Sequence, residues 1–352
     1  MAKQTLAKAN KDKKNEFYTQ YDDIEREMNA YYEYNKNVFK DKVVLLPCDD
    51  PEWSNFTRYF VSNFDRFGLK KLISTSYALS SGNEKTTDFE KTASCYDANK
   101  HDNHGKVFVL TRKDKRVDFD DIEWRYLEGD GDFRSDEVKI YRDEADIIIT
   151  NPPFALFREF FAWVMEGKKQ FAIVGNQNAI AYKEIFPFIK DNKIWLGNGF
   201  KGNVGFFKSP YEDTAVAAEH KEGMIRVSGV MWFTNIDLKK RHEVIEYMTM
   251  TENLTYNKTL IKKLKEDYDE VKYQKYDNYD AIDVPQSEAI PSDYTGVMGV
   301  PITFLTKYNP DVFEIIGKMS TNSIDEYNFG YPYVKETKKF ARILIRFKSK
   351  EV

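Results

Sequence analysis

The sequence predicts an α/β protein with a doubly wound sheet, followed by a C-terminal region of different character. Segments suited to buried strands alternate with helical segments over residues 42–195, which is typical of a parallel sheet with helices on both faces. Residues 238–280 instead mix acidic and basic side chains and favour helices. We expect a flexible basic tail at 1–15, a sheet domain at 16–237 and a C-terminal region at 238–352. The last strand of that region either stays in it or returns to the core.

The first half of the sheet domain opens with a predicted helix at residues 22–34, where two aspartates give an acidic helix start. Residues 42–46 are the first predicted strand, which ends at the Pro-Cys-Asp-Asp-Pro sequence of residues 47–51 because proline cannot continue a ladder. Ser54 is a suitable N-cap for a helix that extends to residue 64. The next predicted elements are strands at 69–74, 106–111 and 124–127, and a short helix at 135–141.

The second half contains the most informative strand of the chain, residues 146–149, Asp-Ile-Ile-Ile. This apolar run suits the centre of a parallel sheet, where both faces are covered. It stops at residues 151–154, Asn-Pro-Pro-Phe, where two successive prolines must leave the sheet. Residues 155–165 are compatible with a helix. The remaining predicted elements are a strand at 171–175, a helix at 182–189, and strands at 194–196, 204–207, 225–233 and 340–347.

The composition excludes several classes of protein. The 352 residues support one large domain or two ordinary ones, and a hydrophobic content of 41% is enough for a packed core. Two cysteines and four histidines are too few for a disulfide framework or a zinc site, so we expect no metal. The sequence shows no signal peptide and no membrane-spanning run, so we expect a soluble, cytoplasmic protein. The net charge of −4 means that a nucleic-acid partner needs a local basic surface.

The Asn-Pro-Pro-Phe turn suits methylation of an exocyclic amine. Strand ends of this kind are where open α/β sheets place their ligands. The amine of adenine is a poor nucleophile, because its lone pair is delocalised into the ring. Two acceptors, the Asn151 side-chain oxygen and the Pro152 carbonyl, would free that lone pair, while Pro153 stiffens the turn and Phe154 stacks on a base swung out of the duplex. The alternative is a rigid strand-to-helix turn without chemistry.

Four segments in this order resemble adenine-specific DNA methyltransferases, most closely the EcoRI type. They are residues 17–19 (Phe-Tyr-Thr), 47–51 (Pro-Cys-Asp-Asp-Pro), 130–133 (Asp-Gly-Asp-Phe) and 151–154. Residues 49–56 and 299–305 have the same character, so the resemblance covers residues 16–347. It implies a Rossmann-like catalytic domain that uses S-adenosylmethionine to methylate adenine in double-stranded DNA by base flipping. It also implies target recognition mainly toward the C-terminus. We expect a monomer, and a cognate restriction endonuclease that acts on the same site is a candidate partner.

The resemblance also implies a set of cofactor-binding residues. These are Phe17, Tyr18, Thr19, Pro47, Asp49, Asp50, Asp130 and Phe133. The glycines beside Asp130 allow close backbone approach, which suits a flat adenine ring between Phe133 and the sheet, with Asp130 accepting from its amine. The chain departs from the family pattern in two places, since the turn at 47–51 has no glycine and residues 72–77 supply no acidic residue for the ribose. We therefore expect the ribose contact from Asp49, Asp50 or a hydroxyl group. The alternatives are an N-terminal segment that packs on the sheet edge at residues 17–19, an Asp-Pro turn with helix capping at 49–51, and a tight surface turn at 130–133.

Candidate DNA-binding residues lie in the later part of the chain. Trp232 ends a late strand and is a candidate wall for a flipped base, although such a residue is more often part of the core. Basic residues with aromatic neighbours crowd the C-terminus and suit a surface that follows phosphates. The candidates there are Lys338, Lys339, Arg342 and Arg346. The alternative is a solvated tail.

Two other functions stay open at this stage. RNA and protein-glutamine methyltransferases also use Asn-Pro-Pro-aromatic turns, but the long segment after residue 238 exceeds what a compact catalytic domain needs. A DNA-binding protein without catalytic activity is the second alternative, and the intact turn at 151–154 argues against it. Calorimetry of cofactor binding separates these possibilities, because a protein that only binds DNA takes up no cofactor.

Overall fold

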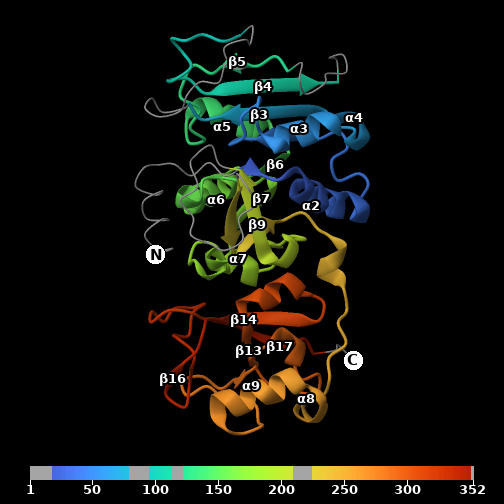
Figure 1. Cartoon of the computed structure of the whole chain (residues 1–352), viewed down its shortest axis with the longest axis vertical. Helices are drawn as coiled ribbons and strands as arrows, with labels where there is room; N and C mark the ends of the chain where they lie inside the picture. The colour runs from blue at the N-terminus through green and yellow to red at the C-terminus, as the bar shows by residue number, and fades with distance from the viewer. Residues whose placement is uncertain (1–17, 79–94, 113–121, 209–223, 350–352) are drawn as a thin grey trace. The chain divides into compact units, whose positions relative to one another are not determined.

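The structure is a computed structural model that describes residues 18–78, 95–112, 122–208 and 224–349. The described residues form two compact units. The first unit lies within Met1–Asn176 and Leu196–Leu238, and the second within Gln177–Trp195 and Lys239–Val352. Figure 1 shows the course of the chain through both units. The predicted tail at 1–15 lies outside the described residues.

The first unit is built around a large sheet. Its strand order is β5-β4-β3-β2-β6-β7-β11-β8. In chain order the strands are β2 (Val43–Leu46), β3 (Lys71–Ser76), β4 (Lys106–Thr111), β5 (Arg125–Tyr126), β6 (Ile147–Thr150), β7 (Gln170–Asn176), β8 (Trp195–Leu196) and β11 (Val230–Thr234). The predicted α/β class is confirmed. The residues of β2 and β6 are all buried, as their apolar sequences predict.

The sheet is mixed, whereas the sequence predicts a parallel one. The central strands β3, β2, β6 and β7 are parallel. The outer strands β4 and β11 run antiparallel to β3 and β7. A parallel pair needs a crossover connection, and helices precede β3, β6 and β7. Within the described residues no helix directly precedes β4 or β11, and a single turn at Gly229 (φ 71°) joins β11 to the strand before it.

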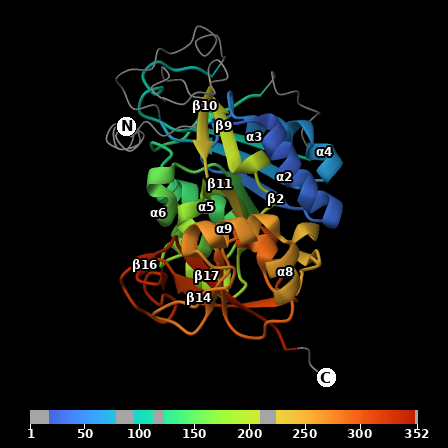
Figure 2. The ribbon, with the colours of Figure 1, turned by 60° about the horizontal axis from the view of Figure 1, so that its bottom comes forward.

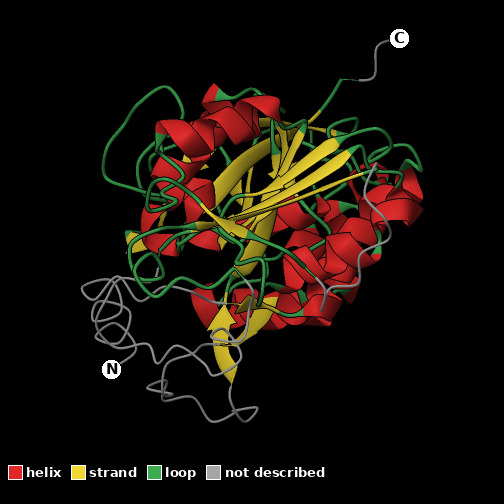
Figure 3. Ribbon diagram, turned by 90° about the horizontal axis from the view of Figure 1, so that it is seen from above, coloured by secondary structure: helices red, strands yellow, loops and turns green. Residues whose placement is uncertain are grey.

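Helices cover both faces of this sheet. They are α2 (Tyr21–Tyr34), α3 (Asn55–Ser62), α4 (Phe64–Phe67), α5 (Asp136–Glu144) and α6 (Phe157–Glu166). Figure 2 shows α2, α3 and α4 on one face and α5 and α6 on the other, and Figure 3 separates the helices in red from the strands in yellow. The predicted N-cap is confirmed, because Ser54 Oγ accepts a hydrogen bond from Phe56 N at 3.0 Å. Ser135 caps α5 in the same way through Val138 N.

A small sheet joins the beginning of the described chain to its later part. It consists of β1 (Tyr18–Thr19), β9 (Val204–Lys208) and β10 (Met224–Ser228), in the order β1-β9-β10. The loop that leads to β9 is held by the buried carboxylate of Glu27 on α2. This carboxylate accepts hydrogen bonds from Asn198 N at 2.9 Å and from Gly199 N at 2.8 Å. The loop is therefore fixed from inside the unit.

The second unit has a sheet of its own, in the order β12-β13-β17-β14. Its strands are β12 (Ile282–Asp283), β13 (Met298–Pro301), β14 (Phe313–Met319) and β17 (Arg342–Phe347), and a separate hairpin pairs β15 (Tyr333–Val334) with β16 (Thr337–Lys338). The last strand, β17, pairs with β13 and β14 and so does not return to the large sheet. The helices of this unit are α7 (Phe186–Lys190), α8 (Met250–Tyr256) and α9 (Lys258–Tyr268).

Short 3-10 turns complete the described structure. They are η3 (Phe154–Leu156), η4 (Gln177–Ala181), η5 (Lys201–Asn203), η6 (Lys239–His242), η7 (Ser287–Ala289) and η8 (Ile302–Lys307). Of these, η3 matters for the site, because it begins at the aromatic residue of the Asn-Pro-Pro-Phe turn and leads directly into α6. No helix in the described part of the chain is long and apolar enough to cross a membrane.

Candidate active site

The strand order of the large sheet reverses between β2 and β6. From β2 the chain proceeds to β3 on one side, and from β6 it proceeds to β7 on the other. The two strands are parallel neighbours, with Val44 paired to Ile147 and Leu45 paired to Ile148. Their carboxyl ends therefore meet at one point, which is where open α/β sheets bind ligands. The segments that follow them are the turn at 47–51 and the turn at 151–154, which the sequence singled out separately.

The Asn-Pro-Pro-Phe turn lies at this point. Thr150 ends β6 as a fully buried residue, and Asn151 and Phe154 after it are half-buried. Pro152 is buried, and the carbonyl of Pro153 accepts a hydrogen bond from Leu156 N at 2.9 Å, which closes the first turn of η3. The backbone is thus fixed on both sides of Asn151, by the sheet before it and by the start of a helix after it.

Asp49 lies inside the protein at the same strand ends. Its Oδ1 accepts a hydrogen bond from Ser54 Oγ at 2.6 Å, and its Oδ2 accepts one from Thr150 Oγ1 at 2.7 Å. Burial raises the pKa of Asp49 to about 7, and the two hydroxyl groups oppose that shift. Both oxygens are thus used within the protein, so these contacts do not support the predicted use of this carboxylate for the cofactor ribose.

A buried ion-pair cluster lies beside this carboxylate, at the end of β3. Lys106 Nζ is 3.2 Å from Asp50 Oδ2 and 2.5 Å from Glu52 Oε2. Burial disfavours the lysine charge, but Asp50 and Glu52 outweigh this effect and raise the pKa of Lys106. Burial likewise raises the pKa of Glu52, against the influence of Lys106. The sequence analysis missed Glu52 and Lys106, because it is the antiparallel pairing of Lys106 with Ser76 that brings the lysine to this strand end.

The turn at 130–133 packs tightly against the end of β3. The carbonyl of Asp130 accepts a hydrogen bond from Ala78 N at 2.7 Å. A Cβ atom on Gly131 (φ 78°) would lie 2.1 Å from the carbonyl oxygen of Ser76, and one on Gly105 would lie 2.4 Å from it. Glycine is therefore required at both positions, because any side chain would push these backbones apart.

The side chains of this turn differ from the prediction in one respect. Asp130 is exposed and therefore accessible to a ligand, but Phe133 is buried against Phe160 and Trp163, with ring centroids 5.1 and 5.7 Å away. The Phe133 ring therefore belongs to the core and does not face an adenine ring. The aromatic side chain beside Asp130 is instead Tyr77, which is 43% exposed and whose pKa is raised first by burial and then by Asp130.

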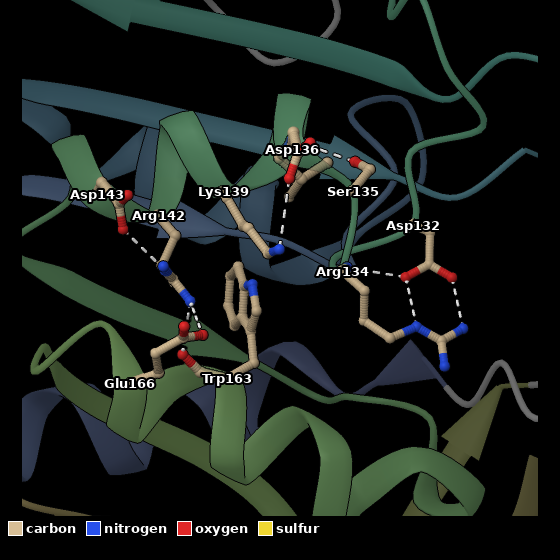
Figure 4. Close-up of polar contacts among 10 residues, drawn as sticks. Asp132, Arg134, Ser135, Asp136, Lys139, Arg142, Asp143, Trp163 and Glu166 are labelled. Atoms are coloured by element: carbon tan, nitrogen blue, oxygen red, sulfur yellow. Dashed lines mark hydrogen bonds and ion pairs between the residues drawn. The ribbon is translucent and has the colours of Figure 1, made fainter.

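Ion pairs brace this turn and the helix after it, as Figure 4 shows. Arg134 contacts Asp132 through two hydrogen bonds, at 2.9 Å from Nε and 2.6 Å from Nη2. On α5, Arg142 Nη1 donates to Glu166 Oε2 at 2.8 Å and to the Trp163 carbonyl at 3.2 Å. The second pair of contacts joins α5 to α6, so the helices before and after β6 are linked.

The other predicted cofactor residues are Phe17, Tyr18, Thr19 and Pro47, and backbone contacts hold two of them in the first unit. Phe17 lies outside the described residues, and Tyr18 is described only as part of β1. Thr19 is buried, and its carbonyl accepts a hydrogen bond from Asn55 Nδ2 at 2.8 Å. Pro47 is buried, and its carbonyl accepts one from Thr75 Oγ1 at 3.2 Å. These contacts attach β1 to α3 and the 47–51 turn to β3.

Two of the predicted DNA-binding residues are buried in this structure, which does not support a contact with DNA. Trp232 is fully buried in the first unit, stacked on Phe200 at 5.9 Å, so it is a core residue. Arg342 is buried in the second unit, where its Nε lies 2.8 Å from Asp283 Oδ1. Trp232 lies on β11, whose residues are all buried, and Arg342 lies in the buried first part of β17. The residue types alone do not reveal this burial.

The remaining basic candidates are accessible. Lys338 is exposed and Lys339 half-exposed, and their ammonium groups lie 3.1 and 4.5 Å from the centroids of the Tyr331 and Tyr268 rings. Arg346 is exposed but already forms an ion pair with Glu314. Among the four basic candidates, accessible positive charge therefore rests mainly on Lys338 and Lys339.

Comparison with known proteins agrees with this arrangement. A family model described as adenine-specific methyltransferase EcoRI matches residues 5–348. The type II methyltransferase M.EcoRI of Escherichia coli is 42% identical over 316 residues, 88% of each chain. The type II methyltransferase M.MpnI of Mycoplasma pneumoniae is 32% identical over 357 residues, 96% of this chain and 97% of the relative. No solved structure matches significantly. The resemblance seen in the sequence is confirmed, and the chain belongs to the EcoRI family of adenine-specific DNA methyltransferases.

Proposed function

We propose that this enzyme transfers a methyl group from S-adenosylmethionine to the exocyclic amine of adenine at a specific site in double-stranded DNA, after flipping the base out of the duplex. The observation that carries the proposal is the Asn-Pro-Pro-Phe turn at the carboxyl end of β6, where the strand order reverses. A base must leave the duplex before a pocket of this kind can surround its amine.

The residues of the turn have distinct roles in the proposed reaction. The Asn151 side-chain oxygen and the Pro152 carbonyl accept the two hydrogens of the target amine, which makes its lone pair available. Phe154 stacks on the flipped adenine. Positive charge develops on the attacking nitrogen as the new bond forms, and the two acceptors stabilise it. No strong base is needed, because the methylated amine loses its proton afterwards.

The proposed cofactor pocket extends from the switch point toward the end of β3. S-adenosylmethionine supplies an electrophilic methyl group on a positively charged sulfur. The close backbone contacts among Ser76, Gly105 and Gly131 hold the turn at 130–133 against the end of β3. Asp130 and Tyr77 are exposed beside it and are the groups we assign to the cofactor's adenine. Asp50 also has internal partners, since it accepts a hydrogen bond from Glu52 N at 2.8 Å and pairs with Lys106. It stays the candidate for the ribose because it lies after β2 and, unlike Asp49, is only half-buried.

The partners follow from this activity. We assign double-stranded DNA as the substrate, and a monomer as the functional unit, with recognition mainly in residues 238–352. A cognate endonuclease that cuts the same site fits the type II designation of the relatives. A DNA substrate fits the cytoplasmic location that we expect from the sequence. RNA or protein-glutamine methylation and loss of catalysis are the alternatives, and the family membership and intact turn disfavour them.

The proposal is tested by incubating purified protein with genomic DNA and methyl donor and then sequencing the DNA with detection of modified bases. The expected result is N6-methyladenine at a single short motif. The same preparation is offered RNA and a glutamine-containing peptide with radiolabelled donor. Label in either of these, with none in DNA, would contradict the proposal.

Phe154→Ala is expected to weaken capture of the flipped base. Stacking contributes roughly 1–3 kcal/mol, so methylation at limiting DNA should fall about 5- to 150-fold. The loss should be smaller when the target adenine is mispaired, because extrusion then costs less. A fluorescent base analogue at the target position measures the flipped fraction. Equal losses on paired and mispaired DNA would exclude a stacking role for Phe154.

Lys338→Gln combined with Lys339→Gln is expected to weaken binding to all DNA sequences alike. If both lysines meet phosphates, the slope of log affinity against log salt decreases in magnitude by about 2. The matched control replaces Lys262 and Lys265, which are exposed on α9, by glutamine. Fluorescence anisotropy over a salt series provides the comparison. If the Lys338/Lys339 variant changes the salt slope no more than the Lys262/Lys265 control does, these two lysines do not form a specific DNA surface.

A further inference from the structure

The carboxyl group of Asp49 connects the elements that meet at the active site. Ser54, its partner through Oδ1, is the N-cap of α3. Thr150, its partner through Oδ2, is the last residue of β6. The backbone of Asp49 is bonded to β3, because its N–H donates to Thr75 O at 2.9 Å and its carbonyl accepts from Ser74 Oγ at 2.6 Å. One residue thus links β2, β3, α3 and β6.

The contact with Thr150 matters most, because Asn151 follows it directly in the chain. Thr150 is β-branched and fully buried, so a hydrogen bond that fixes its hydroxyl group also fixes the side chain and the backbone from which Asn151 extends. Beyond Asn151 the backbone enters the Pro-Pro segment, which has little freedom of its own. The position of the Asn151 oxygen therefore depends on the bond between Thr150 and Asp49.

We propose that Asp49 is a positioning residue, which couples the loop at 47–54 to the catalytic turn through Thr150 and makes no contact with substrate or cofactor. The proposal rests on the proposed function, since the purpose of the contact is to hold the Asn151 oxygen where the target amine arrives. It assigns Asp49 a role different from the ribose contact that the family resemblance implies.

The protonation state of this carboxyl is part of the proposal. In the ionised form both oxygens accept from hydroxyl groups, as the geometry shows, whereas a protonated carboxyl would donate and force one hydroxyl group to turn. Burial raises the pKa of Asp49 to about 7. In the described residues, Asp50 is the charged group that acts on it, and it raises the pKa further. The side chains that α3 and β6 present to it are the neutral hydroxyl groups of Ser54 and Thr150.

Two opposite pH dependences follow. The turnover number is expected to rise with pH through about 7, as the carboxyl ionises and accepts from Thr150. Stability changes in the other direction. The pKa of Asp49 in the folded protein lies above the unfolded value of about 4. The contribution of the protonated Asp49 carboxyl to the free energy of unfolding is therefore fully present below pH 4 and is lost as the pH rises through 7. Asp49→Asn removes the ionisable group, so both dependences should flatten in that variant.

The decisive experiment compares Thr150→Val, Asp49→Asn and the double variant. Valine keeps the shape and β-branching of threonine and removes only the hydroxyl group. We expect each single variant to lower the turnover number about 10- to 100-fold through misplacement of Asn151, with the dissociation constant for S-adenosylmethionine changed less than about threefold. The double variant should be no worse than the more impaired single variant, since both changes break the same contact.

Thr57→Val is the matched control. Its hydroxyl group lies 2.7 Å from Ser74 Oγ, in the same buried network, but it does not contact Asp49 or Thr150. It should lower thermal stability and leave the turnover number nearly unchanged. If Asp49→Asn does not fold, Thr150→Val and the pH profile of the wild type still test the proposal.

Three results would overturn it. Weaker cofactor binding at unchanged turnover would make Asp49 a direct ligand. Independent, multiplying losses in the double variant would mean that the two residues act separately. Losses equal to those of Thr57→Val would reduce the contact to a structural role. Failure of the proposed function is distinguishable, because the wild type itself would then methylate no adenine.

Discussion

Asn151→Ala is expected to abolish methylation while the protein still binds S-adenosylmethionine. The Asn151 oxygen is needed to hold the target amine, and the proposed cofactor pocket lies toward β3, away from this side chain. Removing one preorganised group that stabilises developing charge costs about 100- to 1000-fold in turnover. Single-turnover methylation of a duplex that carries the recognition site measures the loss, and calorimetry measures cofactor binding.

Asn151→Asp serves as the comparison for this prediction. The carboxylate keeps an acceptor oxygen at nearly the same place, so this variant should retain more activity than the alanine variant. If Asn151→Ala keeps more than about a tenth of wild-type turnover, the barrier has changed by less than ~1.4 kcal/mol, and the assigned role of the amide oxygen is wrong. Loss of cofactor binding in the alanine variant would instead place Asn151 in the cofactor pocket.

Arg342→Ala is expected to destabilise the second unit strongly. The guanidinium group and the Asp283 carboxylate are both buried, and the Tyr276 hydroxyl donates to the same carboxylate oxygen at 2.7 Å. Removing the arginine leaves a buried charge without its cation, which typically costs about 3–5 kcal/mol. Urea denaturation, followed by circular dichroism, measures the change in the free energy of unfolding.

Arg346→Ala is the matched control, because it lies on the same strand. Arg346 is exposed, and its partner Glu314 is partly exposed. Exposed ion pairs contribute only about 0–1 kcal/mol to the free energy of unfolding. The two variants should therefore differ in stability by several kcal/mol, about 2–5. Similar stability, together with weaker DNA binding of the Arg342 variant, would return Arg342 to the phosphate-binding role that the sequence suggested.

The elements that could be predicted from the sequence are those with strong local signals. The Asp-Ile-Ile-Ile run identified the central strand and its burial, because an unbroken apolar run suits a strand that is covered on both faces. Ser54 identified the start of α3, because a hydroxyl group before a helix can accept from its first N–H groups. The Asn-Pro-Pro-Phe turn identified the reaction class, and family membership agrees with it.

The sequence did not predict the direction of the outer strands β4 and β11. An apolar run of residues predicts a strand but not the strand it pairs with, and the same sequence fits a parallel or an antiparallel neighbour. Strand β4 is antiparallel to β3, and this pairing alone brings Lys106 to Ser76 and to the acidic residues of the 47–54 loop. The ion-pair cluster beside the proposed cofactor pocket is thus a consequence of pairing.

The α/β class, the Asn-Pro-Pro-Phe turn and the family could be predicted from the sequence, because each depends on residues that are adjacent in the chain. Which side chains are buried, and what they contact, depends on residues that are far apart in the chain. Thr150 and Asp49 are 101 residues apart, and Arg342 and Asp283 are 59 residues apart. A carboxylate or a guanidinium group looks the same in a sequence whether it faces solvent or a buried partner. Only the folded chain, in which desolvation must be offset by a specific contact, separates a ligand from a positioning residue and a DNA contact from a buried ion pair.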